Sequence, residues 1–208
     1  MFNTQKLKEL CENSNLSIVE IYNSEDLLKR NNGWINAVLT KNDKYFGYEF
    51  DAERTGEISN YVIKLSTLQI SEQEHAETVK LLQVLSDVER VSDYCENIAE
   101  FAETMVEKKI TFSEMGAQHL NEIMNEALAS YKFALEAFKE GNRDKALKVI
   151  EKETIVDDME VKLRNQHIKR LTNNECNTEA GIIFLDMLVV LERISDHARN
   201  IAEEVLGK

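Results

Sequence analysis

One stretch of this chain occurs twice, and that repeat limits what the chain can fold into more than any other feature. The first copy reads DVERVSDYCENIAE and the second reads LERISDHARNIAE. Glu192 and Asp196 of the second copy each stand 103 residues after the matching acids of the first copy, Glu89 and Asp93. A repeat of this length in a chain of 208 residues predicts two related halves.

Both copies have the apolar spacing of a helix that packs into a bundle. Apolar residues recur at alternating steps of four and three: Val84, Val88, Val91, Cys95, Ile98, Ala102 and Met105, then Met187, Leu191, Ile194, Ala198, Ile201 and Val205. The chain has no proline, which favours long uninterrupted helices over a turn-rich sheet protein. We therefore predict an all-α chain with halves at 1–109 and 110–208.

Turn and capping residues set the predicted helix ends. Ser71 and Glu74 have the spacing of a capping box, which opens a helix that runs to about residue 107. In the second half, turn signals separate three predicted helices, about 113–140, 144–172 and 178–206. Asp144 is expected to cap the middle one. By the repeat, the first half should hold a shorter version of this arrangement.

The matched acids form one carboxylate pair in each copy. Acids at i and i+4 leave the same helix face about 6 Å apart along the axis, and like charges so placed repel each other. Arg90 and Arg193 follow Glu89 and Glu192 directly in sequence, but they point about 100° away around the helix. A bound cation is the other partner, and carboxylate oxygens suit Mg, Ca, Mn or Fe. A solvated acidic face beside the packing stripe is the alternative.

The two copies resemble the E/D-x-x-x-D signature of the PhoU family. The longer run GIIFLDMLVVLERISDHARNIAE is similar to the cytoplasmic PhoU-like domain of bacterial sodium–phosphate cotransporters. The resemblance covers roughly Asp51 to Lys208 and does not extend over residues 1–50. It implies two tandem three-helix bundles with six long helices. It also implies metal clusters at the bundle surface, held by the signature carboxylates Glu89, Asp93, Glu192 and Asp196.

The same resemblance singles out three more acids as metal candidates. Glu153 and Asp157 form another E-x-x-x-D ahead of an R-x-x-H-I segment, and Asp51 stands opposite Asp157 in the repeat. Gly47 stands where the first half would need a counterpart of Glu153. For Glu153 and Asp157 the alternative is a pair that faces solvent, and His197 is either a ligand or a structural histidine. The metal stays open among iron, zinc, manganese, magnesium and calcium.

Net charge, apolar runs and cysteines indicate which partners and which compartment to expect. The net charge of −13 repels nucleic acid phosphates and anionic lipid headgroups. No run of about 18 apolar residues is present, and no basic and apolar leader begins the chain, so we expect no membrane insertion. Three cysteines form no close-spaced pair, which is typical of a reducing compartment. We expect a cytoplasmic protein.

The leading functional hypothesis is a metal-binding regulatory or interaction protein of phosphate transport and phosphate signalling, without enzymatic activity. By resemblance, its partner is a phosphate transporter, the membrane domain of a sodium–phosphate cotransporter, or a phosphate-sensing kinase. Two alternatives are a carboxylate-bridged di-metal enzyme, for which the sequence lacks the histidine ligands, and a metal-free helical adaptor. Whether the chain forms a homodimer stays open.

Overall fold

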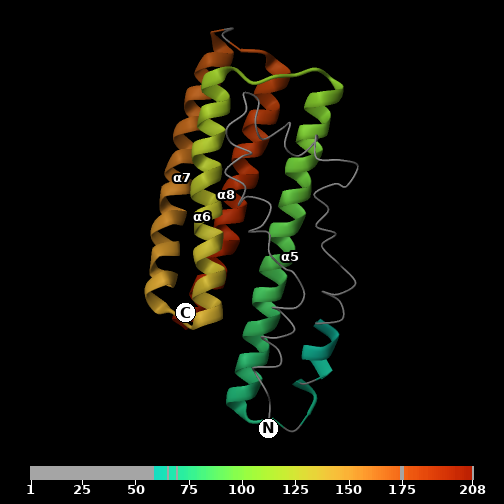
Figure 1. The fold of residues 1–208 in the computed structure, drawn as a ribbon, viewed down its shortest axis with the longest axis vertical. Coiled ribbons are helices and arrows are strands. Elements are labelled where there is room, and N and C mark those ends of the chain that lie inside the picture. Colours follow the sequence, from blue (N-terminus) through green and yellow to red (C-terminus); the bar gives the residue numbers. More distant parts are fainter. Residues whose placement is uncertain (1–58, 65, 69, 174–175, 208) are drawn as a thin grey trace. The chain divides into compact units, whose positions relative to one another are not determined.

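The computed structural model describes residues 59–64, 66–68, 70–173 and 176–207 (Figure 1). These residues form helices and the turns that join them, with no strand among them, which confirms the all-α prediction. The long helices in the described ranges are α5 (Glu72–Glu107), α6 (Glu114–Glu140), α7 (Arg143–Thr172) and α8 (Thr178–Leu206). Residues 59–64 are also helical. The predictions for residues 1–58, including Asp51 and most of the first bundle, lie outside the described residues.

α5 begins at the predicted capping box. The Ser71 N–H donates to Glu74 Oε2 over 2.8 Å, and the Glu74 N–H donates back to Ser71 Oγ over 3.3 Å. Most of the predicted apolar stripe of this helix is buried, from Val84 to Met105, and Cys95 is half-buried. The chain divides by compactness into two units, Met1–Ser92 and Asp93–Lys208. The boundary predicted at 109/110 stays a prediction.

The other three helices form a bundle in which each packs against the other two (Figure 1). Their bounds lie within one residue of those predicted from the turn signals. Polar side chains cap their first turns: Ser113 accepts from the Gly116 N–H, and Asn177 accepts from two backbone N–H groups of α8. Gly141 ends α6 with a φ of 64°, a left-handed conformation that glycine adopts without strain.

One capping prediction is wrong. Asp144 does not cap α7, because it lies in the first turn of that helix. Asn142 is the cap, and its Oδ1 accepts from the N–H groups of Asp144 and Lys145, both over 3.1 Å. The helix therefore begins one residue earlier than predicted, and the Asp144 carboxylate still lies favourably at the positive end of the helix dipole.

The core of the three-helix bundle is apolar and rich in small residues. α6 contributes a stripe of alanines around Tyr131, and α8 contributes the largest apolar share, with Phe184, Met187 and Leu188 nearly inaccessible to solvent. None of the helices in the described ranges is long and apolar enough to cross a membrane.

Candidate metal centre

α7 contacts the bundle through a stripe that is only partly apolar. Its buried positions are spaced by three and four residues: Ala146, Val149, Glu153, Val156, Glu160, Leu163 and His167. Three positions of this stripe, seven residues apart in the sequence, are polar: Glu153, Glu160 and His167. Each of these contacts an arginine side chain, respectively Arg199, Arg164 and Arg170. For the two glutamates an arginine partner is expected, because burial of an unpaired charge is strongly unfavourable.

The predicted acids of the second half converge where α7 packs against α8. One carboxylate oxygen from each of Glu153, Asp157 and Asp196 lies within 4.8 Å of the others. Glu153 is only 4% exposed, so the alternative of a solvent-facing pair does not hold for it. Oδ1 of Asp157 is buried, and none of the described residues donates a hydrogen bond to it. A buried carboxylate oxygen without a donor is the kind of atom that a cation would satisfy.

Burial and the neighbouring negative charges raise the pKa of two acids at this place, Asp157 and Glu192. Burial, and then the charges of Glu153 and Asp196, raise the pKa of Asp157 above its ordinary value. Burial and the charge of Asp196 likewise raise the pKa of Glu192, to which Asp157 and Glu160 add. Glu192 therefore belongs to the same negative cluster. Such a cluster is unfavourable unless positive charge is nearby.

Two arginines supply that charge in the structure. Arg199 Nη1 donates to Glu153 Oε1 over 2.7 Å, and its Nε donates to Glu203 over 3.0 Å. Arg193 Nη1 donates to Asp196 Oδ2 over 3.0 Å and lies 3.5 Å from Glu192. Arg193 therefore forms ion pairs with both signature acids, although it leaves the helix about 100° away from Glu192. Its long side chain bends back across the helix surface, and a Cα direction does not predict that.

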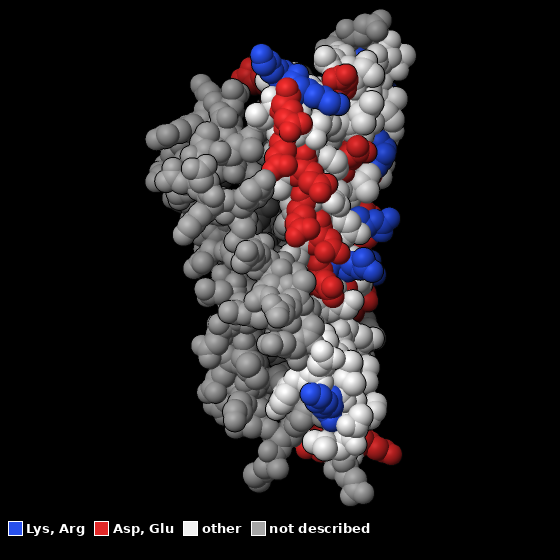
Figure 2. Space-filling view, turned by 90° about the vertical axis from the view of Figure 1, so that its right-hand side faces the viewer, with Lys and Arg blue, Asp and Glu red and all other residues white. Residues whose placement is uncertain are grey.

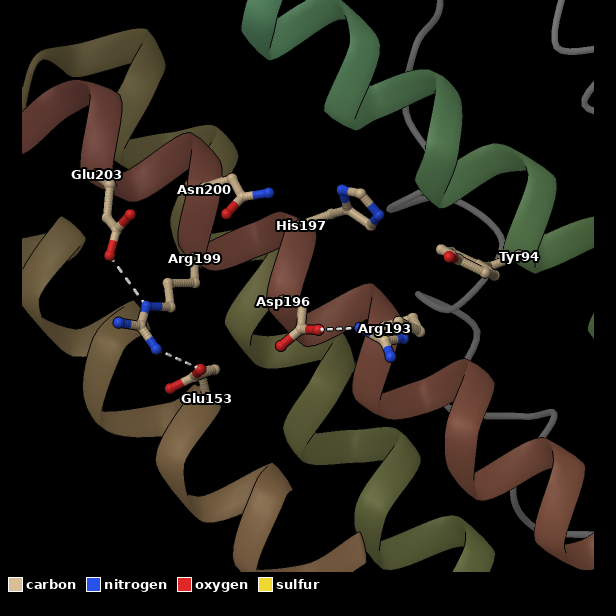
Figure 3. Close-up of a pocket in the computed structure, with 8 residues that line it drawn as sticks. All are labelled: Tyr94, Glu153, Arg193, Asp196, His197, Arg199, Asn200 and Glu203. Carbon is tan, nitrogen blue, oxygen red and sulfur yellow. Dashed lines mark hydrogen bonds and ion pairs between the residues drawn. The ribbon is translucent and has the colours of Figure 1, made fainter. Parts of the chain in front are cut away.

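A polar hollow of about 430 Å³ lies beside the carboxylates (Figure 3). It is lined by Tyr94, Glu153, Arg193, Asp196, His197, Arg199, Asn200 and Glu203. Figure 3 shows the Arg199 guanidinium between Glu203 and Glu153. The His197 ring lies 5.7 Å from the Tyr94 ring, and it is not one of the three clustered ligand groups. This favours the structural interpretation of His197.

The first copy presents its acids differently. Glu89 and Asp93 are exposed on α5. They begin a row of acids at steps of four and three: Glu89, Asp93, Glu96, Glu100, Glu103 and Glu107. Figure 2 shows acidic side chains gathered in such a row. Their predicted partner Asp51 lies outside the described residues, so the first site stays a prediction.

Two residues of the second site were missed by sequence reasoning. Glu160 stands seven residues after Glu153, which is the same face of the helix two turns on. Arg199 stands 103 residues after Glu96, so the repeat offset already marked it as a place where the two copies carry opposite charges. Both signals were present in the sequence.

The donor set fits a hard cation. The converging atoms are carboxylate oxygens from two helices, without a sulfur or nitrogen ligand among the three. Glu153, Asp157 and Asp196 would hold the ion, and Glu192 adds negative charge beside them. A bound ion would cross-link α7 to α8 and neutralise the cluster.

The fold and site together define a class: helical-bundle proteins with E-x-x-x-D carboxylates where two long helices pack. Within that class the chain belongs to the PhoU domain family, whose sequence model matches residues 51–102 and 120–205.

Two relatives agree with this family. The chain is 30% identical over 128 residues to the Thermotoga maritima phosphate-specific transport system accessory protein PhoU homolog 1, covering 62% of this chain and about half (54%) of that protein. It is 23% identical over 200 residues to the Clostridium acetobutylicum phosphate-specific transport system accessory protein PhoU homolog, covering 95% and 88%. Both relatives are named as accessory proteins of phosphate-specific transport systems.

The fold also resembles the crystal structure of PhoU from Pseudomonas aeruginosa. The TM-score is 0.71 with 23% sequence identity, over 76% of this chain and 75% of that one.

Proposed function

We propose that this chain is a cytoplasmic, metal-binding accessory protein that regulates phosphate transport. Its class comes from the PhoU domain family and from two relatives named for phosphate-specific transport systems. The observation that carries the metal-binding part is the convergence of one carboxylate oxygen from each of Glu153, Asp157 and Asp196, together with the buried Oδ1 of Asp157, to which none of the described residues donates.

The ion's role in this proposal is to shape a surface. It ties α7 to α8 and removes the local repulsion, so the metal-loaded bundle presents a different charge to a partner than the metal-free bundle does. The proposed partner is a phosphate transporter. The resemblance to the cytoplasmic domain of sodium–phosphate cotransporters makes the membrane domain of such a cotransporter the alternative, and a phosphate-sensing kinase is the partner for a signalling role.

Metal analysis tests the proposal most simply. The chain purified without added metal should contain bound metal, and Glu192→Ala/Asp196→Ala should lose it from the second site. The pair Glu179→Ala/Asp186→Ala removes two exposed acids from the same helix and should leave the metal content unchanged. Equal metal in both double variants would contradict the assignment. Phosphate uptake by cells that carry each variant in place of the wild type then tests the transport role.

One observation favours a metal-free helical adaptor as the second candidate. Arg199 and Arg193 already neutralise Glu153 and Asp196 in the structure, so part of the cluster has protein partners. An adaptor of this kind would contain no metal in the analysis above and would bind the same partner with or without a chelator.

A further inference from the structure

We propose that Arg199 competes with the metal for Glu153, so that metal binding in the second half requires the Arg199–Glu153 ion pair to open. This inference rests on the proposed metal-binding function and concerns how that site is controlled. It makes the site a switch between two cations, a guanidinium and a metal ion, that use the same buried carboxylate.

The contact between the two residues is the first reason. Arg199 Nη1 lies 2.7 Å from Glu153 Oε1, and this bond joins α8 to α7 across 46 residues of sequence. Glu153 is buried, and its carboxylate is one of the three that converge. A metal ion on these oxygens would bring its positive charge close to the guanidinium. Two cations that share one buried carboxylate repel each other strongly.

Arg199 also has an alternative partner, so its guanidinium can leave Glu153. Its side chain is 43% exposed, and its Nε is bonded to Glu203 over 3.0 Å, one turn along the same helix. The guanidinium can therefore leave Glu153 and keep an ion pair at the edge of the hollow (Figure 3). A fully buried arginine with one partner would have no such exit.

The repeat adds an independent reason. Every signature acid of the second copy has an acidic counterpart in the first, but Arg199 stands opposite Glu96. The first copy thus carries an acid on α5 where the second carries a cation. The second signature site therefore contains a competing cation at a position where the sequence of the first copy has an acid.

The test compares metal affinity in single variants of the full chain. Isothermal titration with Mn²⁺, after chelator treatment, is made on the wild type, Arg199→Gln, Arg199→Lys and Arg143→Gln. Arg143 is the charge-matched control, because its Nη1 bonds the Leu206 carbonyl over 3.0 Å and contacts none of the clustered acids. The competition predicts tighter binding in Arg199→Gln, on the order of tenfold, because the metal no longer breaks a charge-assisted hydrogen bond.

Thermal unfolding gives a second readout. Without metal, Arg199→Gln should melt below the wild type, since Glu153 is left buried without its partner. With saturating Mn²⁺ the deficit should shrink or reverse. A merely structural arginine would lower both melting temperatures equally. Arg199→Lys keeps the charge but cannot bridge both acids as the guanidinium fork does. Its affinity for Mn²⁺ should therefore lie between those of the wild type and Arg199→Gln. This variant replaces Arg199→Gln in the test if Arg199→Gln folds poorly.

The outcomes separate the two proposals. Unchanged or weaker Mn²⁺ binding in Arg199→Gln, with measurable binding in the wild type, overturns the competition and leaves the metal site standing. Equal tightening in Arg143→Gln also overturns it, because the effect would then be long-range charge alone. Absence of Mn²⁺ binding in all four proteins overturns both. Tighter binding confined to the Arg199 variants supports the competition.

Discussion

At the scale of single residues, the crowded acids where α7 packs against α8 should make the stability of this bundle depend on pH. Asp157 has one carboxylate oxygen that is buried and lacks a donor among the described residues, and its neighbours Glu153 and Asp196 are also acidic. Without metal, its ionised form is therefore held in an unfavourable place. The free energy of unfolding should report this as a dependence on pH.

For Asp157 the sign follows from its raised pKa. The folded state holds the proton more tightly than the unfolded state, whose pKa is near the ordinary 3.8. The stabilising contribution is complete below that value and is lost as the pH rises through the higher folded pKa. Asp157→Asn cannot ionise. In EDTA, its melting temperature relative to the wild type should therefore increase from pH 3.5 to pH 7, as measured by circular dichroism.

Asp158→Asn is the control, because this neighbour is exposed on the same helix. Its melting temperature relative to the wild type should change much less over the same range. If the melting temperature of Asp157→Asn relative to the wild type stays constant, or falls as the pH rises, the crowding of these acids is contradicted. With metal present, Asp157→Asn should melt below the wild type, since the variant lacks one ligand.

The sequence predicted which acids belong to this cluster better than it predicted their ion-pair partners. Four acids of the second half were predicted, and the structure brings Glu153, Asp157 and Asp196 together with Glu192 beside them. The pairing of Arg199 with Glu153 was not predicted. Periodicity within one helix shows which face a residue occupies, but it does not give the alignment of α7 against α8 on which the Arg199–Glu153 contact depends.

At the scale of elements, helix ends were predictable because each is marked by local chemistry. Asn177 caps α8 and Gly141 ends α6, and both are readable without knowledge of the fold. Interhelical packing is less local. Near the start of α8, Gly181 lies against the His167 ring of α7, which stacks on Phe184 with 4.4 Å between ring centroids.

That close approach gives a prediction for Gly181→Ala. A Cβ at this position would lie 2.8 Å from His167 Nε2 and 2.8 Å from Leu171 Cδ2. The histidine has little freedom to move, because its Nδ1 accepts from Arg170 and its ring is stacked. Overpacking of about 1–3 kcal/mol should exceed the helix propensity gain of roughly 0.5–1 kcal/mol. Urea denaturation should show a net loss of stability on the order of 1 kcal/mol.

Asp186→Ala is the matched substitution, since Asp186 is exposed on the same helix and its change to alanine adds no atom that could displace a neighbour. Its free energy of unfolding should change little. Gly181→Ala with stability equal to or above the wild type would show that α7 and α8 can separate at this end at no cost.

For the whole molecule, the question is whether the second half is a unit. α6, α7 and α8 pack against one another around an apolar core of their own. A fragment of residues 110–208 should therefore be helical and should unfold cooperatively by circular dichroism and calorimetry. If only a fragment that begins at Asp93, where the second compact unit starts, unfolds cooperatively, the boundary predicted from the repeat is wrong.

The central claim is that the clustered carboxylates of α7 and α8 hold a metal ion. Anomalous diffraction from crystals of the protein as purified, collected at several metal absorption edges, tests it most directly. The account predicts an anomalous peak bounded by the carboxylates of Glu153, Asp157 and Asp196, with the Arg199 guanidinium displaced toward Glu203. Well-ordered carboxylates with no anomalous peak, and with Arg199 still bonded to Glu153, would contradict it.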